Sequence, residues 1–425
     1  MNKLFLLLLV PLIATAGCGK QRPSELTFWH VMGGPLGKTL DAMAGDFQKE
    51  TGIKVTMVNM GSYPALSQKL MASMAAGNTP ALSQSYESWT SQLLEAKTKD
   101  NGVQPFADFL DAQDGLDSAA RADFFPVMLA ECARDGKFVS MPFNKSVPVY
   151  YYNRDLFRKA GLDPDRFPET WDEFLAAAKK LTIDRNRNGR LDPGDQWGTA
   201  MSKNAAWLFQ CMLIQNRGQV FDENGKVVFD SPAGIEALQF LADLNNKHKV
   251  SYTVQGFDHQ NDFLSGRVAM IQSSSASLSY MKQDSIKFDM GIAPLPRFKK
   301  RAVVLSGTNI VMFRNAAKGT QHNAWKYVKF MTGTRQTARW AAETNYLPVR
   351  KSALNEDILK EKFIKYYGLK DAYKQLEYAY PEPRETAWLT GRARLEEDGL
   401  QPAMEGVSTA AQSLRNAAAK INRQR

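Results

Sequence analysis

The sequence predicts an α/β protein of two domains with largely parallel sheets. Short strand-like runs alternate with helical segments along the first part of the chain, which is the pattern of parallel α/β units. The 425 residues exceed the length of one ordinary domain, about 100–200 residues, so we expect two domains. With 44% hydrophobic and 23% charged residues the chain can bury a large core, and the composition excludes a disordered, collagen-like or disulfide-dependent protein.

The N-terminus has the organisation of a secretory signal peptide. A positive charge at Lys3 precedes the apolar run 4–13, which is too short to span a bilayer permanently. Small residues then lead to Cys18, and the segment resembles a bacterial lipoprotein signal, in which Cys18 becomes the lipidated first residue. Ordinary cleavage beside an incidental cysteine is the alternative. We expect residues 1–17 to be removed, residues 18–25 to form a tether, and the mature protein to be soluble apart from its anchor.

The first part of the mature chain alternates between strand and helix signals. Apolar residues at helical spacing, among them Leu40 and Phe47, indicate a helix that ends before Gly52. Runs rich in β-branched and aromatic residues lie on either side of this helix. We expect strands at residues 26–31, 53–58 and 81–86 and helices at residues 36–50 and 66–74.

The middle of the chain contains a predicted crossover. Residues 141–144 precede a strand at 147–152, and we interpret them as a passage between two lobes. Pro148 favours an edge position for that strand, because proline cannot donate a ladder hydrogen bond. Thr170 and Glu173 have the spacing of a capping box. Helices are expected at 171–181, 235–246, 325–331 and 408–421 (within a largely helical segment from residue 385), and a strand-like run at 303–313 is expected to be interrupted at 306–309.

Residues 184–195 have the spacing of a calcium-binding loop. Oxygen-bearing side chains fall at loop positions 1, 3, 5, 9 and 12, and Gly189 stands at position 6, where the chain must turn sharply. The expected metal ligands are Asp184, Asn186, Asn188, the carbonyl of Arg190, Asp192 and Asp195. Aspartate at the last position and the arginines in the loop predict a weak, structural Ca²⁺ site, with a Kd of about 10⁻⁴–10⁻³ M. The alternative is a polar surface turn that binds no ion.

Neither the charge nor the cysteines identify a partner. The net charge is +10, but 54 Lys and Arg are interspersed with 44 Asp and Glu without a long basic run, so we expect general surface charge and no nucleic-acid partner. Beyond Cys18 the sequence contains only Cys132 and Cys211. The two could form a disulfide in an oxidising envelope, and two buried free thiols are the alternative.

The sequence contains none of the catalytic motifs considered below in complete form. Only three residues separate Gly33 from Gly37 in the glycine-rich segment 33–39, whereas a phosphate-binding P-loop needs four. The sequence has no Gly-x-Ser-x-Gly elbow and no His-Glu-x-x-His zinc motif. Its four histidines are widely separated, and His30 alone is placed where it could face a cleft. We therefore expect a binding protein and no enzyme; an exported hydrolase with carboxylates paired in three dimensions is the less favoured alternative.

Several short motifs in a common order resemble the extracellular solute-binding proteins of ABC importers, of the large sugar-binding class. The resemblance covers essentially the whole mature chain and, within the class, is strongest to members that bind glycerol-3-phosphate. It is carried by Phe28-Trp29-His30 with Gly37-Lys38, Tyr86-Glu87, Pro142-Phe143-Asn144-Lys145-Ser146 leading into Tyr151-Tyr152-Asn153, Lys159-Ala160-Gly161-Leu162-Asp163-Pro164, Thr170-Trp171 and Tyr346-Leu347-Pro348-Val349.

This resemblance implies the periplasmic-binding-protein fold, in which two α/β lobes are joined by crossover strands and close over a ligand in the cleft. The implied lobes are residues 26–140 with 297–340, and residues 141–296 with 341–425. The implied protein is an exported monomer of the cell envelope that needs no catalytic cofactor. Its partners are a small-molecule ligand, the permease subunits of the importer, and the membrane through the lipid anchor.

The resemblance also implies the ligand contacts and the ligand class. The residues that match are Tyr63, Glu87, Ser146, Ser274, Gly307 and Tyr346, with Trp207 as a further aromatic side chain and Arg394 as the phosphate ligand. Serine hydroxyls donate to phosphate or hydroxyl oxygens, tyrosines cover a polyol, and guanidinium matches phosphate bidentately. We expect glycerol-3-phosphate or a glycerophosphodiester as ligand. Arg392 is the reserve for Arg394, and a neutral mono- or oligosaccharide is the alternative if neither arginine faces the cleft.

Overall fold

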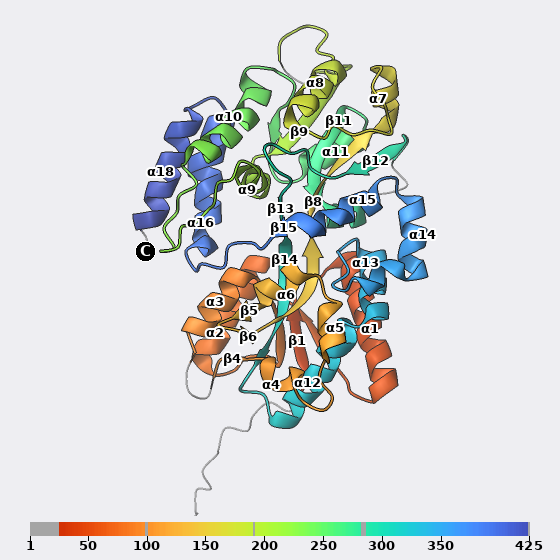
Figure 1. Cartoon of the computed structure of the whole chain (residues 1–425), viewed down its shortest axis with the longest axis vertical. Helices are drawn as coiled ribbons and strands as arrows, with labels where there is room; N and C mark the ends of the chain where they lie inside the picture. The colour runs from red at the N-terminus through yellow and green to blue at the C-terminus, as the bar shows by residue number, and fades with distance from the viewer. Residues whose placement is uncertain (1–24, 98–100, 190–191, 282–285, 424–425) are drawn as a thin grey trace, which may run out of the picture.

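The computed structural model describes residues 25–97, 101–189, 192–281 and 286–423, and it has two α/β lobes (Figure 1). Cys18, the signal peptide and nearly all of the tether lie outside the described residues, as does Arg190 of the predicted calcium loop. Each lobe is built around one sheet. We call the lobe with the first strand lobe 1 and the other lobe 2. The predicted α/β class is confirmed.

The sheet of lobe 1 combines parallel and antiparallel strands. Its order is β2 (Thr56–Asn59), β1 (Thr27–His30), β3 (Leu82–Ser85), β14 (Ser306–Phe313) and β4 (Val103–Gln104), and β7 (Met141–Ser146) also pairs with β14. The first three strands are parallel, as the alternation of strands and helices predicts. β14 is antiparallel to β3, β4 and β7. Because β14 comes from a distant part of the chain, no local pattern indicates its direction.

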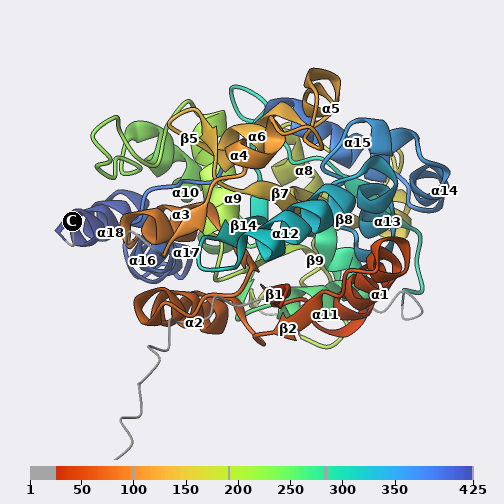
Figure 2. The ribbon, with the colours of Figure 1, turned by 90° about the horizontal axis from the view of Figure 1, so that it is seen from below.

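Helices cover both faces of this sheet, with α2 and α3 on one side and α1 and α13 on the other (Figure 2). Leu40 and Phe47 lie on the buried face of α1, and Gly52 ends that helix in the left-handed conformation. The helices and the small hairpin of lobe 1 are α1 (Gly34–Thr51), α2 (Tyr63–Ala76), α3 (Glu87–Glu95), α4 (Ala107–Leu110), α5 (Ser118–Ala122), α6 (Pro126–Cys132), β5 (Ala133–Arg134), β6 (Lys137–Phe138), α12 (Lys318–Met331), α13 (Thr334–Thr344) and α14 (Asp357–Lys365).

The sheet of lobe 2 has the same mixed character. Its order is β10 (Thr253–Val254), β9 (Trp197–Ser202), β11 (Val268–Ser274), β8 (Pro148–Asn153) and β12 (Met290–Ala293). β9, β10 and β11 are parallel, and β8 is antiparallel to both of its neighbours. The helices of this lobe are α7 (Arg154–Lys159), α8 (Trp171–Leu181), α9 (Ala206–Gln215), α10 (Pro232–Asn246), α11 (Asp258–Leu264) and α15 (Leu369–Tyr373).

Two local predictions in lobe 2 have different outcomes. The capping box is confirmed, because the Thr170 hydroxyl accepts from Glu173 N and the Glu173 carboxylate accepts from Thr170 N. The edge position predicted for the strand at Pro148 is wrong, because β8 lies between β11 and β12. The proline is tolerated because it is the first residue of β8, and the pairing with β12 begins only at Tyr150.

The predicted interruption at residues 306–309 is also wrong. β14 runs unbroken from Ser306 to Phe313, with a register shift between Thr308 and Asn309. Its first half pairs with β7, so hydrogen bonds to a distant strand override the turn-forming preferences of Ser, Gly and Asn. Just before it, β13 (Val303–Val304) pairs with β15 (Ala379–Tyr380).

The C-terminal part is helical, as predicted. α16 (Trp388–Arg394), a π-helical segment (Leu395–Leu400), α17 (Gln401–Met404) and α18 (Ala410–Arg423) follow one another. α18 packs against α10 and α16, which places this group of helices on lobe 2, while α16 also contacts α3 of lobe 1. The C-terminal helices therefore reach across the boundary between the lobes.

The chain passes between the lobes where β7 continues through Val147 into β8, where β13 leads into β14, and between α14 and α15. β15 lies beside β13 at this boundary (Figure 1). β7 belongs to the sheet of lobe 1, so the predicted boundary at residue 140 falls before this strand and not after it. α14 packs on α13, so residues 357–365 also lie with lobe 1, although the sequence assigned them to lobe 2.

Two further observations concern the chain as a whole. Cys132 in α6 and Cys211 in α9 are both buried free thiols, which is the second of the two alternatives that the sequence left open. Within the described ranges, we find no helix that combines the length and the apolar character needed to cross a membrane.

A candidate ligand-binding cleft between the lobes

Polar and aromatic side chains gather where the two lobes meet. Of the predicted ligand contacts, Tyr63 begins α2 and Glu87 begins α3. Ser146 ends β7, Gly307 lies in β14 opposite Lys145, and Tyr346 follows α13. Each of these residues therefore sits at an end of an element or on a strand that leads toward lobe 2.

Three tyrosines and Asn144 form the first group. Asn144 Nδ2 donates to the Tyr63 hydroxyl at 3.4 Å, and the Tyr63 hydroxyl is also in hydrogen-bonding reach of Tyr86 and Tyr346. The ring of Tyr86 lies 5.0 Å from Trp89 and 5.1 Å from Tyr63. Burial raises the pKa values of Tyr63 and Tyr346 well above the ordinary value, so both hydroxyls stay protonated and able to donate. This group can cover a small polyol and bond its oxygens.

A buried lysine with two carboxylates forms the second group. Lys145 Nζ lies 2.8 Å from Glu87 Oε1, makes an ion pair with Glu131, and donates to the Gly307 carbonyl at 3.0 Å. Asn309 Nδ2 donates to the same Glu87 oxygen at 2.9 Å. Burial would lower the pKa of Lys145, but the two carboxylates outweigh it and raise that pKa. Burial, with the charge of Glu87, raises the pKa of Glu131 well above the ordinary value. Glu87 is thus an oriented acceptor.

An arginine–glutamate pair forms the third group, and it concerns the two candidate arginines. Arg392 Nη1 donates to Glu382 Oε1 at 2.9 Å, and Ser306 Oγ donates to Glu382 Oε2 at 3.1 Å. Burial raises the pKa of Tyr86, and the positive charge of Arg392 acts to lower it. Arg394 instead lies 3.8 Å from Glu397 and 3.9 Å from Asp398, within its own helical segment, and its side chain is 42% exposed. The structure therefore brings Arg392, and not Arg394, to the cleft.

Three other predicted contacts have structural partners of their own. A Cβ on Gly307 would lie 2.0 Å from the Asn144 carbonyl oxygen, so the close approach at this glycine is to β7. Trp207 Nε1 donates to the Val304 carbonyl at 2.8 Å, beside the crossover. The Ser274 hydroxyl accepts from Ala276 N at the end of β11. Each of these three residues therefore has a role in the fold, and its contact with a ligand stays a prediction.

A cavity of about 950 Å³ opens beside these groups. It is lined from lobe 1 by Glu87 and Glu131, from lobe 2 by Gln210 and Arg217, and between them by the segment that includes Glu382. Its size suits a small ligand. The cavity between the lobes is thus lined by hydrogen-bond acceptors and donors and by both positively and negatively charged side chains.

Comparison with known proteins agrees with this architecture. A family model described as bacterial extracellular solute-binding protein matches residues 42–366. The chain belongs to the bacterial extracellular solute-binding proteins. As a member of that family it is the solute-binding component of an ABC importer.

Similar relatives of this solute-binding protein carry a common name. The sn-glycerol-3-phosphate-binding periplasmic protein UgpB of Pectobacterium atrosepticum is 29% identical over 80% of this chain and 76% of its own length. The protein of the same name from Shigella dysenteriae is 30% identical over 78% of this chain and 76% of its own length. These relatives are binding proteins.

Solved structures confirm the two-lobe fold of the solute-binding protein. UgpB from Mycobacterium tuberculosis in complex with glycerophosphocholine has a TM-score of 0.80 at 23% identity, over 95% of this chain and 99% of that one. The cyclic α-maltosyl-1,6-maltose binding protein from Arthrobacter globiformis has a TM-score of 0.77 at 23% identity, over 94% of this chain and 98% of that one. The likeness concerns the fold.

The predicted calcium loop of the solute-binding protein is closed by its own hydrogen bonds. Asn186 Nδ2 and Asn188 Nδ2 donate to one oxygen of Asp192 at 2.7 and 2.6 Å, and Asp184 Oδ2 accepts from Gly189 N at 2.8 Å. Asp195 accepts from two backbone N–H groups. Among the described residues, no group of three or more His, Cys, Asp and Glu side chains is placed to hold a metal ion. The loop has the expected oxygens in one turn, but not in a ligating arrangement.

Sequence reasoning missed several residues of the cleft. Asn144 and Lys145 stand inside a motif that carries the resemblance, and their polar side chains in an apolar strand were a usable signal. Glu131 and Glu382 lie far from that motif in sequence, and only the fold brings them to Lys145 and Arg392. No pattern of neighbouring residues marks either glutamate.

Proposed function

We propose that this solute-binding protein binds glycerol-3-phosphate or a glycerophosphodiester between its lobes and delivers it to an ABC permease. The observation that carries the proposal is the pairing of Arg392 with Glu382, a residue that lines the cavity of about 950 Å³ together with the oriented acceptor Glu87. The names of the relatives and of the structural neighbour support the same ligand class.

Each group has a distinct task in this proposal. The planar guanidinium of Arg392 pairs with the phosphate, for which Glu382 holds it in place. Glu87 accepts from glycerol hydroxyls, and Lys145 holds that carboxylate in place. Tyr63, with the other tyrosines, covers the carbon skeleton from lobe 1. Ligand between the lobes then favours the closed form that the permease recognises.

Two neighbouring arginines give a matched test. Arg392→Ala should lower the affinity for glycerol-3-phosphate, measured by isothermal titration calorimetry, by about 2–3 kcal/mol, since a charge-assisted pair is lost. Arg394→Ala removes the same charge from the exposed side of α16 and should leave affinity within about twofold of the unaltered protein. Unchanged phosphate affinity in Arg392→Ala would refute the assignment. Recovery of unaltered ligand after binding also separates a carrier from a hydrolase.

A neutral sugar is the second candidate. The adjoining rings of Tyr63, Tyr86 and Trp89 offer the apolar faces that sugar rings stack on. A thermal-shift panel with glycerol-3-phosphate, glycerophosphocholine, maltose and a longer glucan distinguishes the two classes. A ligand at about 100 times its Kd stabilises the native state by about 2.7 kcal/mol. An increase in unfolding temperature with the sugars alone would show that the cleft binds a neutral sugar.

The lipid anchor is part of the same proposal. Export through the signal at residues 1–17 and lipidation at Cys18 would hold the protein at the envelope surface, where its permease is. Cys18→Ser should move the protein from the membrane fraction to the soluble fraction, without changing ligand affinity. A Cys18→Ser protein that stays in the membrane fraction would refute the anchor.

A structural calcium ion in the loop at residues 184–195 also belongs here. The carboxylates of Asp184, Asp192 and Asp195 belong to this one turn, and hard oxygens are the ligands that Ca²⁺ prefers. Millimolar Ca²⁺ should raise the unfolding temperature, and Asp184→Asn should abolish the increase. Asp222→Asn, in another turn closed by an aspartate, is the control. No increase with the unaltered protein would mean that the loop is a polar turn.

A further inference from the structure

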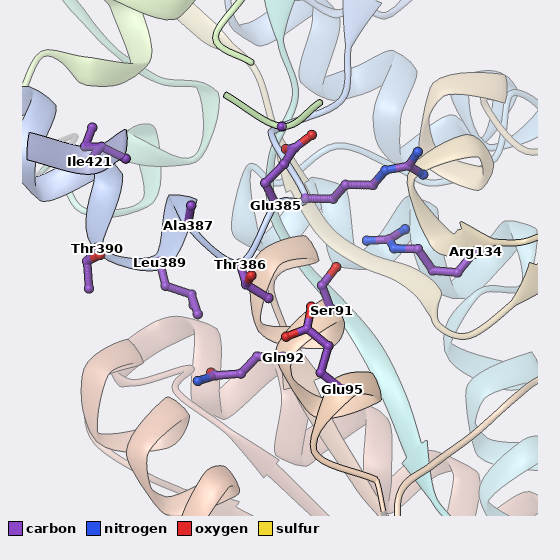
Figure 3. Close-up of a pocket in the computed structure, with 12 residues that line it drawn as sticks. Ser91, Gln92, Glu95, Arg134, Glu385, Thr386, Ala387, Leu389, Thr390 and Ile421 are labelled. Carbon is purple, nitrogen blue, oxygen red and sulfur yellow. The ribbon is translucent and has the colours of Figure 1, made fainter. Parts of the chain in front are cut away.

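A second cavity, of about 680 Å³, adjoins the proposed ligand cleft (Figure 3). It lies between α3 of lobe 1 and the segment that leads into α16. Arg384 and Glu385 line both this cavity and the larger one that contains Glu87. A ligand in the cleft could therefore extend into this second space, and we call it the side cavity.

Arg134 and Arg384 both line the side cavity. The guanidinium of Arg134 points toward the segment around Glu385 and Thr386 (Figure 3). The pKa of Arg134 is lowered, first by burial and then by the positive charge of Arg384, so the two guanidinium groups lie close enough to repel. Two like charges at one wall of a cavity make a site for an anion.

The two arginines lack acidic partners. Arg134 is held by three carbonyls, those of Glu131, Ala133 and Glu87, and its Nε is buried without a hydrogen-bond partner. In the part of the chain that the structure describes, no carboxylate lies within ion-pair distance of either guanidinium. By contrast, Arg392 in the cleft is paired with Glu382. No carboxylate therefore compensates the charges of Arg134 and Arg384 at contact distance, whereas Glu382 compensates the charge of Arg392.

The side cavity also carries negative groups. Glu95 on α3 and Glu385 on the facing segment line it with the arginines, together with polar Ser91, Gln92, Thr386 and Thr390. A wall with two arginines and two carboxylates matches a group that itself carries both charges. An α-amino acid, with its carboxylate and ammonium groups, has that chemistry.

We propose that the side cavity binds the amino-acid head group of a glycerophosphodiester, with its carboxylate on Arg134 and Arg384. The inference rests on the proposed function, because the glycerophosphate part occupies the cleft beside Glu87. It adds a ligand class: phosphodiesters with a zwitterionic amino-acid head group, such as that of glycerophosphoserine. The ammonium group of such a head faces Glu95 on α3.

Two ligands that differ by one carboxylate test this inference. Glycerophosphoserine and glycerophosphoethanolamine share the phosphodiester and the ammonium group, so their affinities report on the carboxylate alone. By isothermal titration calorimetry, the protein should bind glycerophosphoserine about tenfold more tightly. Arg384→Gln should abolish this difference and leave the affinity for glycerophosphoethanolamine unchanged.

Control variants separate the site from general attraction by charge. Arg394→Gln removes one positive charge from the exposed side of α16, outside both cavities, and it should preserve the preference for glycerophosphoserine. Arg134→Gln should have the same effect as Arg384→Gln. Arg134 also donates to backbone carbonyls, so the Arg134→Gln protein could be unstable; in that case the result with the exposed Arg384 decides the test. Equal binding of the two ligands, or a preference that survives Arg384→Gln, would overturn the inference. Binding of glycerol-3-phosphate without either head-group ligand would overturn the inference and keep the proposed function, whereas binding of none of the three would refute both.

Discussion

Lys145 Nζ lies 2.8 Å from Glu87 Oε1, with both side chains almost completely buried. This contact joins β7, the strand that leads into lobe 2, to the first residue of α3. Glu131 contributes a second carboxylate to the same ammonium group. The fold thus has a buried ionic centre at the point where the chain crosses between the lobes.

The ionic centre should contribute to stability only as a unit. Lys145→Met leaves Glu87 and Glu131 buried without a cation, and we expect a loss of about 3–5 kcal/mol in the free energy of unfolding, measured with urea. The triple variant Lys145→Met/Glu87→Gln/Glu131→Gln should recover most of that loss, because no uncompensated charge stays buried. A triple variant as unstable as the single one would show that packing, and not charge, accounts for the effect.

Lys362 should make stability depend on pH. Its Nζ donates to the Ala341 and Ala342 carbonyls at the end of α13, and burial lowers its pKa to about 7. An unfolded lysine titrates near about 10.4, so between these values the unfolded chain binds more protons and the free energy of unfolding rises with pH. The slope should approach about 1.4 kcal/mol per pH unit from this group.

Variants of neighbouring lysines test that pH dependence. Unfolding by urea between pH 7 and 9 should show the rise in the unaltered protein and lose it in Lys362→Met. Lys360→Met changes an exposed lysine two residues away and should keep the rise. A rise of equal size in Lys362→Met would mean that other groups are responsible.

Gly307→Ala should impair folding. The φ of Gly307 is 118°, and an added Cβ would meet the Asn144 carbonyl oxygen at 2.0 Å, so we expect a loss of about 3 kcal/mol or more in the free energy of unfolding. Gly319→Ala, in α12 where an added Cβ meets nothing within 4 Å, should be neutral or stabilising. The ligand affinity of Gly307→Ala has to be measured on the folded fraction. Otherwise a loss of folded protein would be mistaken for the loss of a contact between Gly307 and the ligand.

Cys132 and Cys211 should be unreactive in the folded protein. Both are buried, and burial raises the pKa of each thiol, that of Cys211 to about 12. In the soluble body without Cys18, a thiol reagent should label no cysteine before denaturation and both after it. The unfolding temperature should be the same with and without reductant. A loss of labelling after oxidation would indicate that the two residues can pair.

Most of the strands and helices expected from local signals are present in the structure. The helix at 171–181 follows from its capping box and its apolar spacing, which depend only on residues a few positions apart. Residues 306–309 show where such signals fail. Their turn-forming side chains lie inside β14, because two distant strands supply the hydrogen bonds that a local turn would otherwise make.

The two arginines of α16 show the same limit in the cleft. Successive helical residues are about 100° apart, so Arg392 and Arg394 point in clearly different directions. Which of the two faces the cleft depends on how α16 packs on α18 and α3, and the sequence does not contain that information in any local pattern.

The sequence by itself determined the α/β class, the periodic helices with their caps and the family resemblance, and it predicts the export signal. Each of these depends on residues that are close along the chain or on motifs in a given order. The tertiary structure alone decided which charges meet, as in the contacts of Lys145 with Glu131 and of Arg392 with Glu382. The physical reason is that burial makes unpaired charges costly, so packing selects their partners from any distance along the chain.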